Sequence, residues 1–157
     1  MLKKLRVTFK ILIISFVLIS ISNAEILKPS SDIKPAEVIQ IQLAGLQKND
    51  FNFKDSGIEQ TWNFAHPNNK KATGPLEKFK KMLKSASYQM MINHLSHTIT
   101  KIESGDNWVQ FEVIILDKEK IYHKFNWQVE KYLIEGPLKD CWLTTMVSNP
   151  IPLGSSI

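Results

Sequence analysis

The chain has 157 residues, 43% of them hydrophobic, which suits one domain with a core of its own. A single cysteine excludes an intrachain disulfide. Four of the 20 lysines and arginines, and none of the 15 acidic residues, lie in residues 1–24, so the net charge of +5 belongs largely to the N-terminus. The remaining chain is close to neutral, which argues against nucleic acid as a partner.

Residues 1–24 have the three parts of a secretory signal peptide: a cationic start, an apolar core over residues 11–21, and small residues at Ser22 and Ala24 before the expected cut. The apolar core is shorter than the roughly 20 residues that a comfortable membrane span needs. We therefore expect cleavage after Ala24, export to the periplasm or the outside of the cell, and no stable membrane anchor afterwards. The alternative is an uncleaved anchor in which residues 7–9 lengthen the apolar segment.

The first half of the mature chain has helical periodicity. Ile39, Leu43 and Leu46 recur at helical spacing behind a proline near the helix start. The same spacing recurs twice more, the second helix being closed by Pro67 and the Asn pair that follows it. Three helices are predicted, over residues 35–47, 58–65 and 76–84.

The apolar period changes to two from about Met91. Four strands are predicted: one that begins near Met91, and three over residues 109–116, 121–129 and 141–147. Helices followed by meandering strands predict a single α+β domain over residues 32–148, with the N-terminal helices on one face of an antiparallel sheet of four or more strands. Residues 149–157 contain two prolines and a glycine and are expected to form an irregular tail.

Several short motifs occur along the chain in a specific order. They are Gln42–Asp50, Gly57–Ile58, Phe64–Lys70, the Thr-Gly-Pro-Leu-Glu-Lys-Phe segment of residues 73–79, Met82, Tyr88 and Cys141-Trp142-x-Thr144. This order resembles domain of unknown function 4864, a bacterial and plant family similar to the C-terminal region of certain plant F-box proteins. The resemblance runs from about Pro35 to Val147. It implies a cone-shaped fold of the nuclear-transport-factor-2 or ketosteroid-isomerase type, with a curved sheet around a long helix. It implies no activity, and no F-box is visible.

The histidines are the chemical candidates. His97 and His123 lie on the apolar faces of their predicted strands, either as core or rim residues with satisfied hydrogen bonds or as a polar pair in a concave pocket, one serving as a general base. His94 and His97 point to opposite faces of a strand, which argues against a shared metal. No carboxylate obviously accompanies them, because Asp50 and Asp55 suit roles at a helix end and a turn. Neither a metal nor a cofactor is expected.

Large aromatic side chains are the second group of candidates. They line a cavity for a small apolar ligand, or they are ordinary core residues. The candidate ligand-binding residues are Trp62, Tyr88, Phe125, Trp127 and Trp142. Cys141 lies in an apolar strand and is expected to be a buried, inert thiol.

The second predicted strand is apolar on both faces, with Ile114 and Leu116 on the side away from the helices. A contiguous exposed apolar patch is unusual on a monomer, so the sequence predicts a homodimer through the outer sheet face, or a C-terminal tail folded over it. The first functional hypothesis is a non-enzymatic exported domain that dimerises or binds a small apolar ligand. The second is a cofactor-free isomerase or dehydratase that uses His97 or His123 in the cone cavity.

Overall fold

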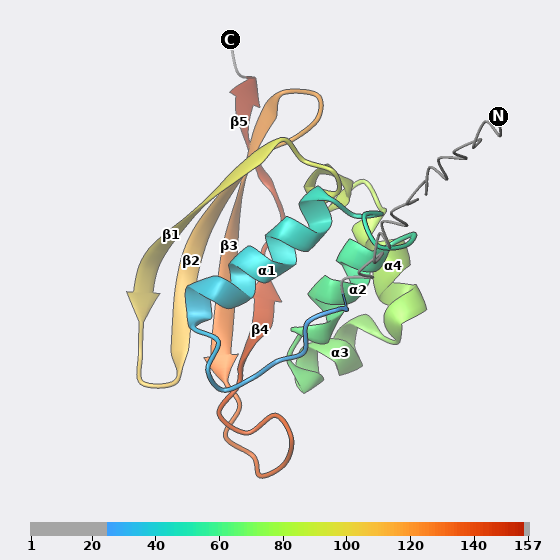
Figure 1. The fold of residues 1–157 in the computed structure, drawn as a ribbon. Coiled ribbons are helices and arrows are strands. Elements are labelled where there is room, and N and C mark those ends of the chain that lie inside the picture. Colours follow the sequence, from blue (N-terminus) through green and yellow to red (C-terminus); the bar gives the residue numbers. More distant parts are fainter. Residues whose placement is uncertain (1–24, 156–157) are drawn as a thin grey trace, which may run out of the picture.

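A computed structural model describes residues 25–155 (Figure 1). The expected signal peptide therefore lies outside the described residues. The helices come first in the chain: α1 (Pro35–Gln47), α2 (Ser56–Asn63), α3 (Pro67–Thr73), α4 (Leu76–Leu83) and a short 3-10 helix, η1 (Gln89–Met91). The strands follow: β1 (Ser96–Ser104), β2 (Trp108–Leu116), β3 (Ile121–Lys131), β4 (Trp142–Val147) and β5 (Ile151–Ser155).

The strands form one antiparallel sheet in the order β1-β2-β3-β4, and β5 pairs with β3 as well. β4 pairs with the end of β3 around Val129, whereas β5 pairs with the beginning around His123. The two strands thus follow one another along the same edge of β3. The sheet is curved and open, and the helices lie on one of its faces (Figure 1). The predicted α+β class is confirmed.

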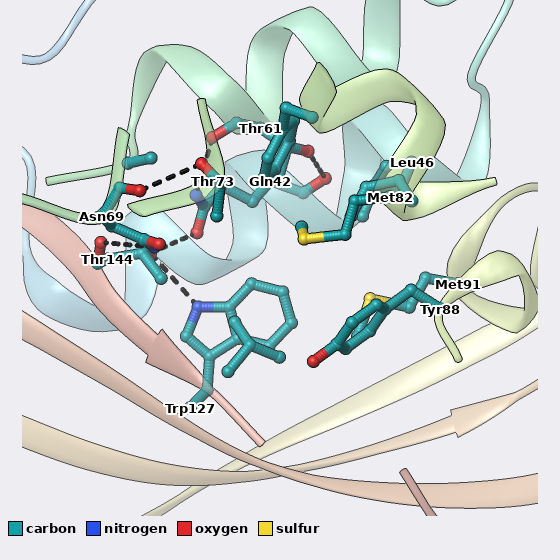
Figure 2. A pocket seen from close by; sticks show the side chains of 14 residues that line it. Gln42, Leu46, Thr61, Asn69, Thr73, Met82, Tyr88, Met91, Trp127 and Thr144 are labelled. Carbon is teal, nitrogen blue, oxygen red and sulfur yellow. Dashed lines mark hydrogen bonds between the residues drawn. The ribbon is translucent and has the colours of Figure 1, made fainter. Parts of the chain in front are cut away.

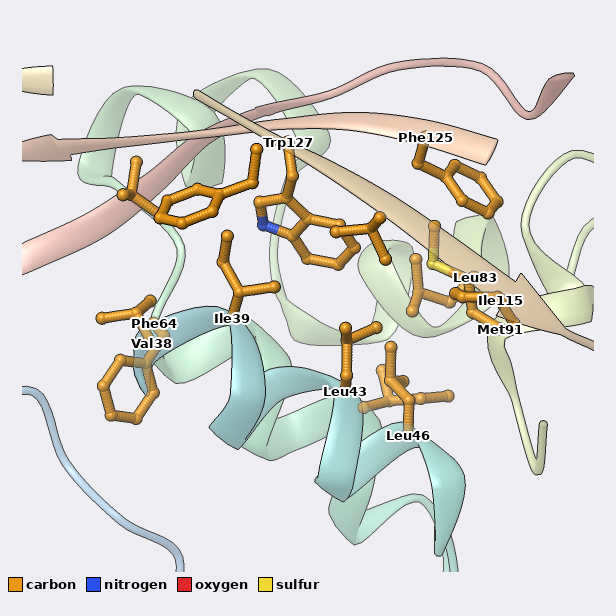
Figure 3. Close-up of a cluster of buried hydrophobic side chains, with 14 of the residues drawn as sticks. Val38, Ile39, Leu43, Leu46, Phe64, Leu83, Met91, Ile115, Phe125 and Trp127 are labelled. Carbon is orange, nitrogen blue, oxygen red and sulfur yellow. The ribbon is translucent and has the colours of Figure 1, made fainter. Parts of the chain in front are cut away.

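The core lies between α1 and the inner face of the sheet (Figure 3). Every second residue of β2 and β3 points toward it, as the period of two predicts, because successive side chains of a strand alternate between its faces. The buried stripe of α1 meets them with Val38, Ile39, Leu43 and Leu46, all fully buried. Burial of each large aliphatic side chain of this stripe favours the folded state by roughly 2 kcal/mol.

The region around Pro67 differs from the prediction. Pro67 was expected to close a helix, but it is the first residue of α3. A proline at this position loses no hydrogen bond, because the first N–H groups of a helix have no partner within the helix. His66 caps the new helix, since its Nδ1 accepts a hydrogen bond of 3.1 Å from the backbone N of Asn68.

The C-terminal tail was also predicted wrongly. Residues 151–155 form β5 and extend the sheet, so they neither remain irregular nor fold over Ile114. Ile151 is the register partner of Lys124, and Pro152 is the partner of His123. A proline is tolerated here because β5 is an edge strand, whose outer N–H groups need no partner in the sheet.

Candidate functional site

A cavity of about 110 Å³ lies between the helices and the inner face of β3 and β4 (Figure 2). Helices α1, α2, α3 and α4 all contribute to its wall, together with the segment around η1. Most of its surface is apolar. It is lined by Gln42, Leu46, Thr61, Ala65, Asn69, Thr73, Phe79, Met82, Leu83, Tyr88, Met91, Trp127, Thr144 and Val147.

A chain of buried hydrogen bonds forms the polar part of the wall (Figure 2). Trp127 Nε1 donates to Thr144 Oγ1 at 3.2 Å, and Thr144 Oγ1 donates to Gln42 Oε1 at 2.6 Å. Gln42 Nε2 donates in turn to the backbone oxygen of Thr61 at 2.9 Å. Gln42, Thr144 and Trp127 are each at least 98% buried. Because buried polar groups are costly when unpaired, this chain fixes the positions of α1, β3 and β4 around the cavity.

Two half-buried residues of the wall have polar groups held by longer contacts. The Tyr88 hydroxyl lies 3.5 Å from Asn149 Oδ1, and Asn69 Nδ2 lies 3.3 Å from the backbone oxygen of Thr144. Hydrogen bonds weaken toward these distances. The hydroxyl of Tyr88 and the amide of Asn69 are therefore the groups best able to exchange their present partners for a bound molecule.

The structure separates the five aromatic candidates. Tyr88 and Trp127 line the cavity. Phe125 is fully buried in the core beside it. Trp62 and Trp142 lie elsewhere: the Lys70 ammonium sits 4.2 Å from the centre of the Trp62 ring, and the Lys131 ammonium sits 5.6 Å from that of Trp142. These two rings bind cations of their own chain.

Sequence reasoning missed the polar members of the wall. Gln42 was the detectable one, because it is a polar residue within the apolar stripe of α1, between Ile39 and Leu46. Thr144 and Asn69 gave no such signal. Thr144 is 102 positions from Gln42 in the chain, and only the folded structure brings the two together.

His94 and His97 meet, which corrects the prediction that they point apart. His94 precedes β1, and Asn93 turns the chain there with a positive φ of 57°. His94 Nδ1 lies 2.7 Å from the Met91 oxygen, so it carries the proton, and His94 Nε2 accepts from His97 Nδ1 at 2.7 Å. Gln40 of α1 completes the chain, with its Nε2 3.2 Å from His97 Nε2. The two rings therefore hydrogen-bond to each other and join α1 to β1.

His123 has a carboxylate partner that sequence reasoning missed. Its Nε2 lies 2.7 Å from Asp117 Oδ2, and its Nδ1 is buried without a hydrogen-bond partner among the described residues. Burial tends to raise the pKa of Asp117, but hydrogen bonds from the Ile121 N–H and from His123 outweigh it and lower the pKa. The register of the hairpin could have revealed this partner. Ile115 pairs with His123, and Asp117 follows Ile115 by two residues, so its side chain lies on the same face of the sheet as His123.

Acid is expected to destabilise the domain through His94. Burial lowers the pKa of His94 from 6.5 to about 4, and the neighbouring His97 adds to this, while the hydrogen bond to Met91 opposes it. At pH values between about 4 and 6.5, His94 binds a proton in the unfolded chain but not in the folded chain, so the free energy of unfolding falls as the pH falls. We expect a loss of about 2 kcal/mol from pH 7 to pH 4.5.

Urea unfolding at a series of pH values measures this loss, with His94→Asn as the matched variant. The variant should lose most of the slope between pH 6.5 and 4.5. Wild-type and variant profiles that stay parallel over this range would contradict the assignment.

Among the described residues, no histidine, cysteine or charged side chain lines the cavity, and Tyr88 is the one ionisable residue of its wall. His97 and His123 lie outside its wall. Within residues 25–155 no group of three or more metal-ligating side chains occurs, and no helix there is long and apolar enough to cross a membrane. Cys141 is buried. Burial raises the pKa of its thiol, and the negative charge of the nearby Asp140 raises it further. The cavity thus offers apolar contact and neutral hydrogen bonds.

A scan against protein-family models matches residues 29–135 to a domain of unknown function, DUF4864. The chain belongs to this family. The matched range contains α1 through β3 and ends before β4, so it includes most of the cavity wall but not Thr144. None of the curated proteins and none of the solved structures matches the chain.

Proposed function

We propose that the domain binds a small, uncharged, largely apolar molecule in the cavity between the helices and the sheet. One observation carries the proposal: the wall that residues 25–155 form combines apolar side chains with neutral hydrogen-bonding groups and contains no charged group. A charged molecule in this cavity would lose more free energy of hydration than its contacts with the wall could replace, because a buried charge needs a partner of opposite charge or hydrogen bonds. An uncharged molecule meets no such penalty.

The size of the cavity limits the ligand. An engineered protein cavity of about 150 Å³ holds benzene, so about 110 Å³ suits a ligand of one small ring or a short branched chain. The apolar part of the ligand would contact Trp127 and Met82. A hydroxyl or carbonyl group would be placed toward Tyr88 or Asn69, whose present contacts are long.

The geometry favours a binding role over the isomerase or dehydratase alternative. A general base must reach the bound substrate directly or through one water. His97 is bound to His94 and Gln40, and His123 is bound to Asp117, all outside the cavity wall. The proposed ligand is therefore held and not transformed.

Two further elements belong to the proposal. The first is a cone of the nuclear-transport-factor-2 type, supported by the curved sheet, the helices on its inner face and the cavity between them (Figure 1). The second is export with cleavage after Ala24. It is supported by the cationic start, the apolar core and the small residues Ser22 and Ala24 of the sequence.

Calorimetric titration of the chain with toluene, phenol and benzoate tests the proposed ligand class. Toluene and phenol are expected to bind with a Kd on the order of 1 mM, with phenol the tighter, and benzoate at least tenfold more weakly. Met82→Trp fills the cavity and should abolish phenol binding. Met90→Trp is the matched control, because Met90 packs against the core without lining the cavity. Equal binding of benzoate and phenol, or unchanged binding by Met82→Trp, would contradict the proposal.

A further inference from the structure

The loop between α1 and α2 exposes two phenylalanines. Phe51 is 75% exposed and Phe53 is 47% exposed, and Phe51 has the largest exposed fraction among the large hydrophobic residues described. Phenylalanine is normally a core residue, so two exposed rings two positions apart in one short loop need an explanation.

Hydrogen bonds within residues 48–56 order the backbone of this loop, and the two rings are exposed on it. The Phe51 N–H donates to the Lys48 oxygen at 3.0 Å, and the Ser56 N–H donates to the Phe53 oxygen at 3.0 Å. Asp50 Oδ1 accepts from the Asp55 N–H at 2.8 Å, which engages the Asp50 carboxylate within the turn. The loop therefore presents its rings without a large ordering cost.

Two lysines and two aspartates flank the rings, and the two aspartates are engaged in hydrogen bonds within the protein. The Lys48 ammonium lies 5.8 Å from the centre of the Phe51 ring, and Lys54 is exposed next to Phe53. Lys54 also lines a polar pocket of about 260 Å³ together with Lys118, Gln89 and Asn93. Asp50 and Asp55 line this pocket too. Asp50 Oδ1 accepts hydrogen bonds from Asn49 Nδ2 and the Asp55 N–H, and the Asp55 carboxylate is bound to Lys84 at 2.7 Å. Exposed rings beside exposed ammonium groups and amides fit an interface between acyl chains and anionic headgroups.

The path of the chain points to the same surface. Ile26 lies in a shallow groove with Lys48 and Phe51, and Leu27 is fixed to Gln60 through its backbone. Four residues separate Ile26 from the apolar stretch of residues 11–21, and that length of extended chain spans at most about 17 Å. The described part of the chain thus begins at the face that carries the two rings.

We propose that this face, comprising Phe51, Phe53, Lys48 and Lys54, docks on the surface of an anionic lipid bilayer. The rings enter the boundary between headgroups and acyl chains, and the lysines bind lipid phosphates. The proposal is independent of the ligand in the cavity.

Site-specific fluorescence tests the orientation of the docked domain. Asn52 is exposed between the two rings, and Asn52→Cys accepts an environment-sensitive nitrobenzoxadiazole label while the buried Cys141 does not. The matched control is a label at Glu135→Cys, next to the exposed Leu133 and Ile134 on the loop between β3 and β4, far from the α1–α2 loop (Figure 1). The labelled full-length chains are mixed with vesicles of phosphatidylcholine and phosphatidylglycerol.

The label at Asn52→Cys is expected to brighten at least about twofold with these vesicles and to be quenched by spin-labelled lipid, while the control label does neither. Adding Phe51→Ser and Phe53→Ser should remove the increase without changing the circular dichroism, because both rings are exposed. Equal behaviour of the two labels, or no increase at Asn52→Cys, would overturn the proposal. So would brightening with protein concentration alone, which would identify a second copy as the partner of this face.

Discussion

Replacing Gly57 with alanine is expected to destabilise the domain by about 4 kcal/mol, because it forces two helices apart. Gly57 lies in the first turn of α2, where α2 crosses α1. A Cβ at this position would lie 2.0 Å from the oxygen of Gly45, 2.5 Å from its carbonyl carbon and 2.9 Å from the Cα of Asn49. All three are backbone atoms of one segment, so no side-chain rotation relieves the overlap.

Gly45→Ala is the matched control at the same crossing. Its Cβ would meet Gln60 Cβ and the Gly57 oxygen at 3.3 Å, a tight contact that small shifts accommodate. Alanine also favours the helix over glycine by about 1 kcal/mol, which offsets part of the strain. Urea unfolding followed by tryptophan fluorescence should show a large loss for Gly57→Ala and a change within about 1 kcal/mol for Gly45→Ala. Similar losses for the two variants would show that close backbone approach does not limit this crossing.

The sheet was predictable because its pattern is local and repeated. Val109, Phe111, Val113 and Ile115 alternate with outward-facing residues, and the structure buries each of the four on the inner face. The turns over residues 104–107 and 117–120 then set β1, β2 and β3 side by side. Register follows from such hairpins, because their short turns fix which residues pair.

Positions where one residue has two structural uses were less predictable. A proline near Asn residues is typical both of the end of a helix and of its beginning, and Pro67 begins one. Prolines in the tail suggested irregular structure, yet an edge strand accepts them, as Pro152 in β5 shows. In both cases the neighbouring residues in space decide, and the sequence window does not contain them.

The candidate site was predicted only in part for a related reason. A buried aromatic side chain that fills the core and one that borders a cavity have the same sequence pattern, so the roles of Phe125 and Trp127 could not be told apart. The hydrogen bond between Gln42 and Thr144 depends on how α1 and β4 pack, and no local signal encodes it. The His123–Asp117 pair was accessible in principle, because both residues belong to one predicted hairpin.

Asn49→Ala is expected to cost about 3 kcal/mol of stability, because Asn49 is a buried junction between α1, the following loop and α2. Asn49 is 3% exposed. Its Oδ1 accepts from the Ile58 N–H at 3.1 Å, and its Nδ2 donates to Asp50 Oδ1 at 2.9 Å and to Asp55 Oδ1 at 3.2 Å. Alanine leaves a buried N–H of α2 without an acceptor and removes a donor from two carboxylates.

Asn49→Asp distinguishes these lost hydrogen bonds from lost packing. An aspartate of the same shape keeps an acceptor for Ile58 but faces Asp50 and Asp55, so burial and the two carboxylates would raise its pKa in the folded state. The folded chain then holds a proton that the unfolded chain releases, and stability must fall as pH rises through the unfolded value near 4. Urea unfolding should therefore show Asn49→Asp less stable at pH 7 than at pH 5 relative to wild type. Asn49→Ala should show a smaller change, and the exposed Asn52→Ala should match wild type at both pH values. A loss for Asn49→Asp that is equal at the two pH values would mean that the introduced carboxylate reaches solvent and that Asn49 is not the sealed junction described above.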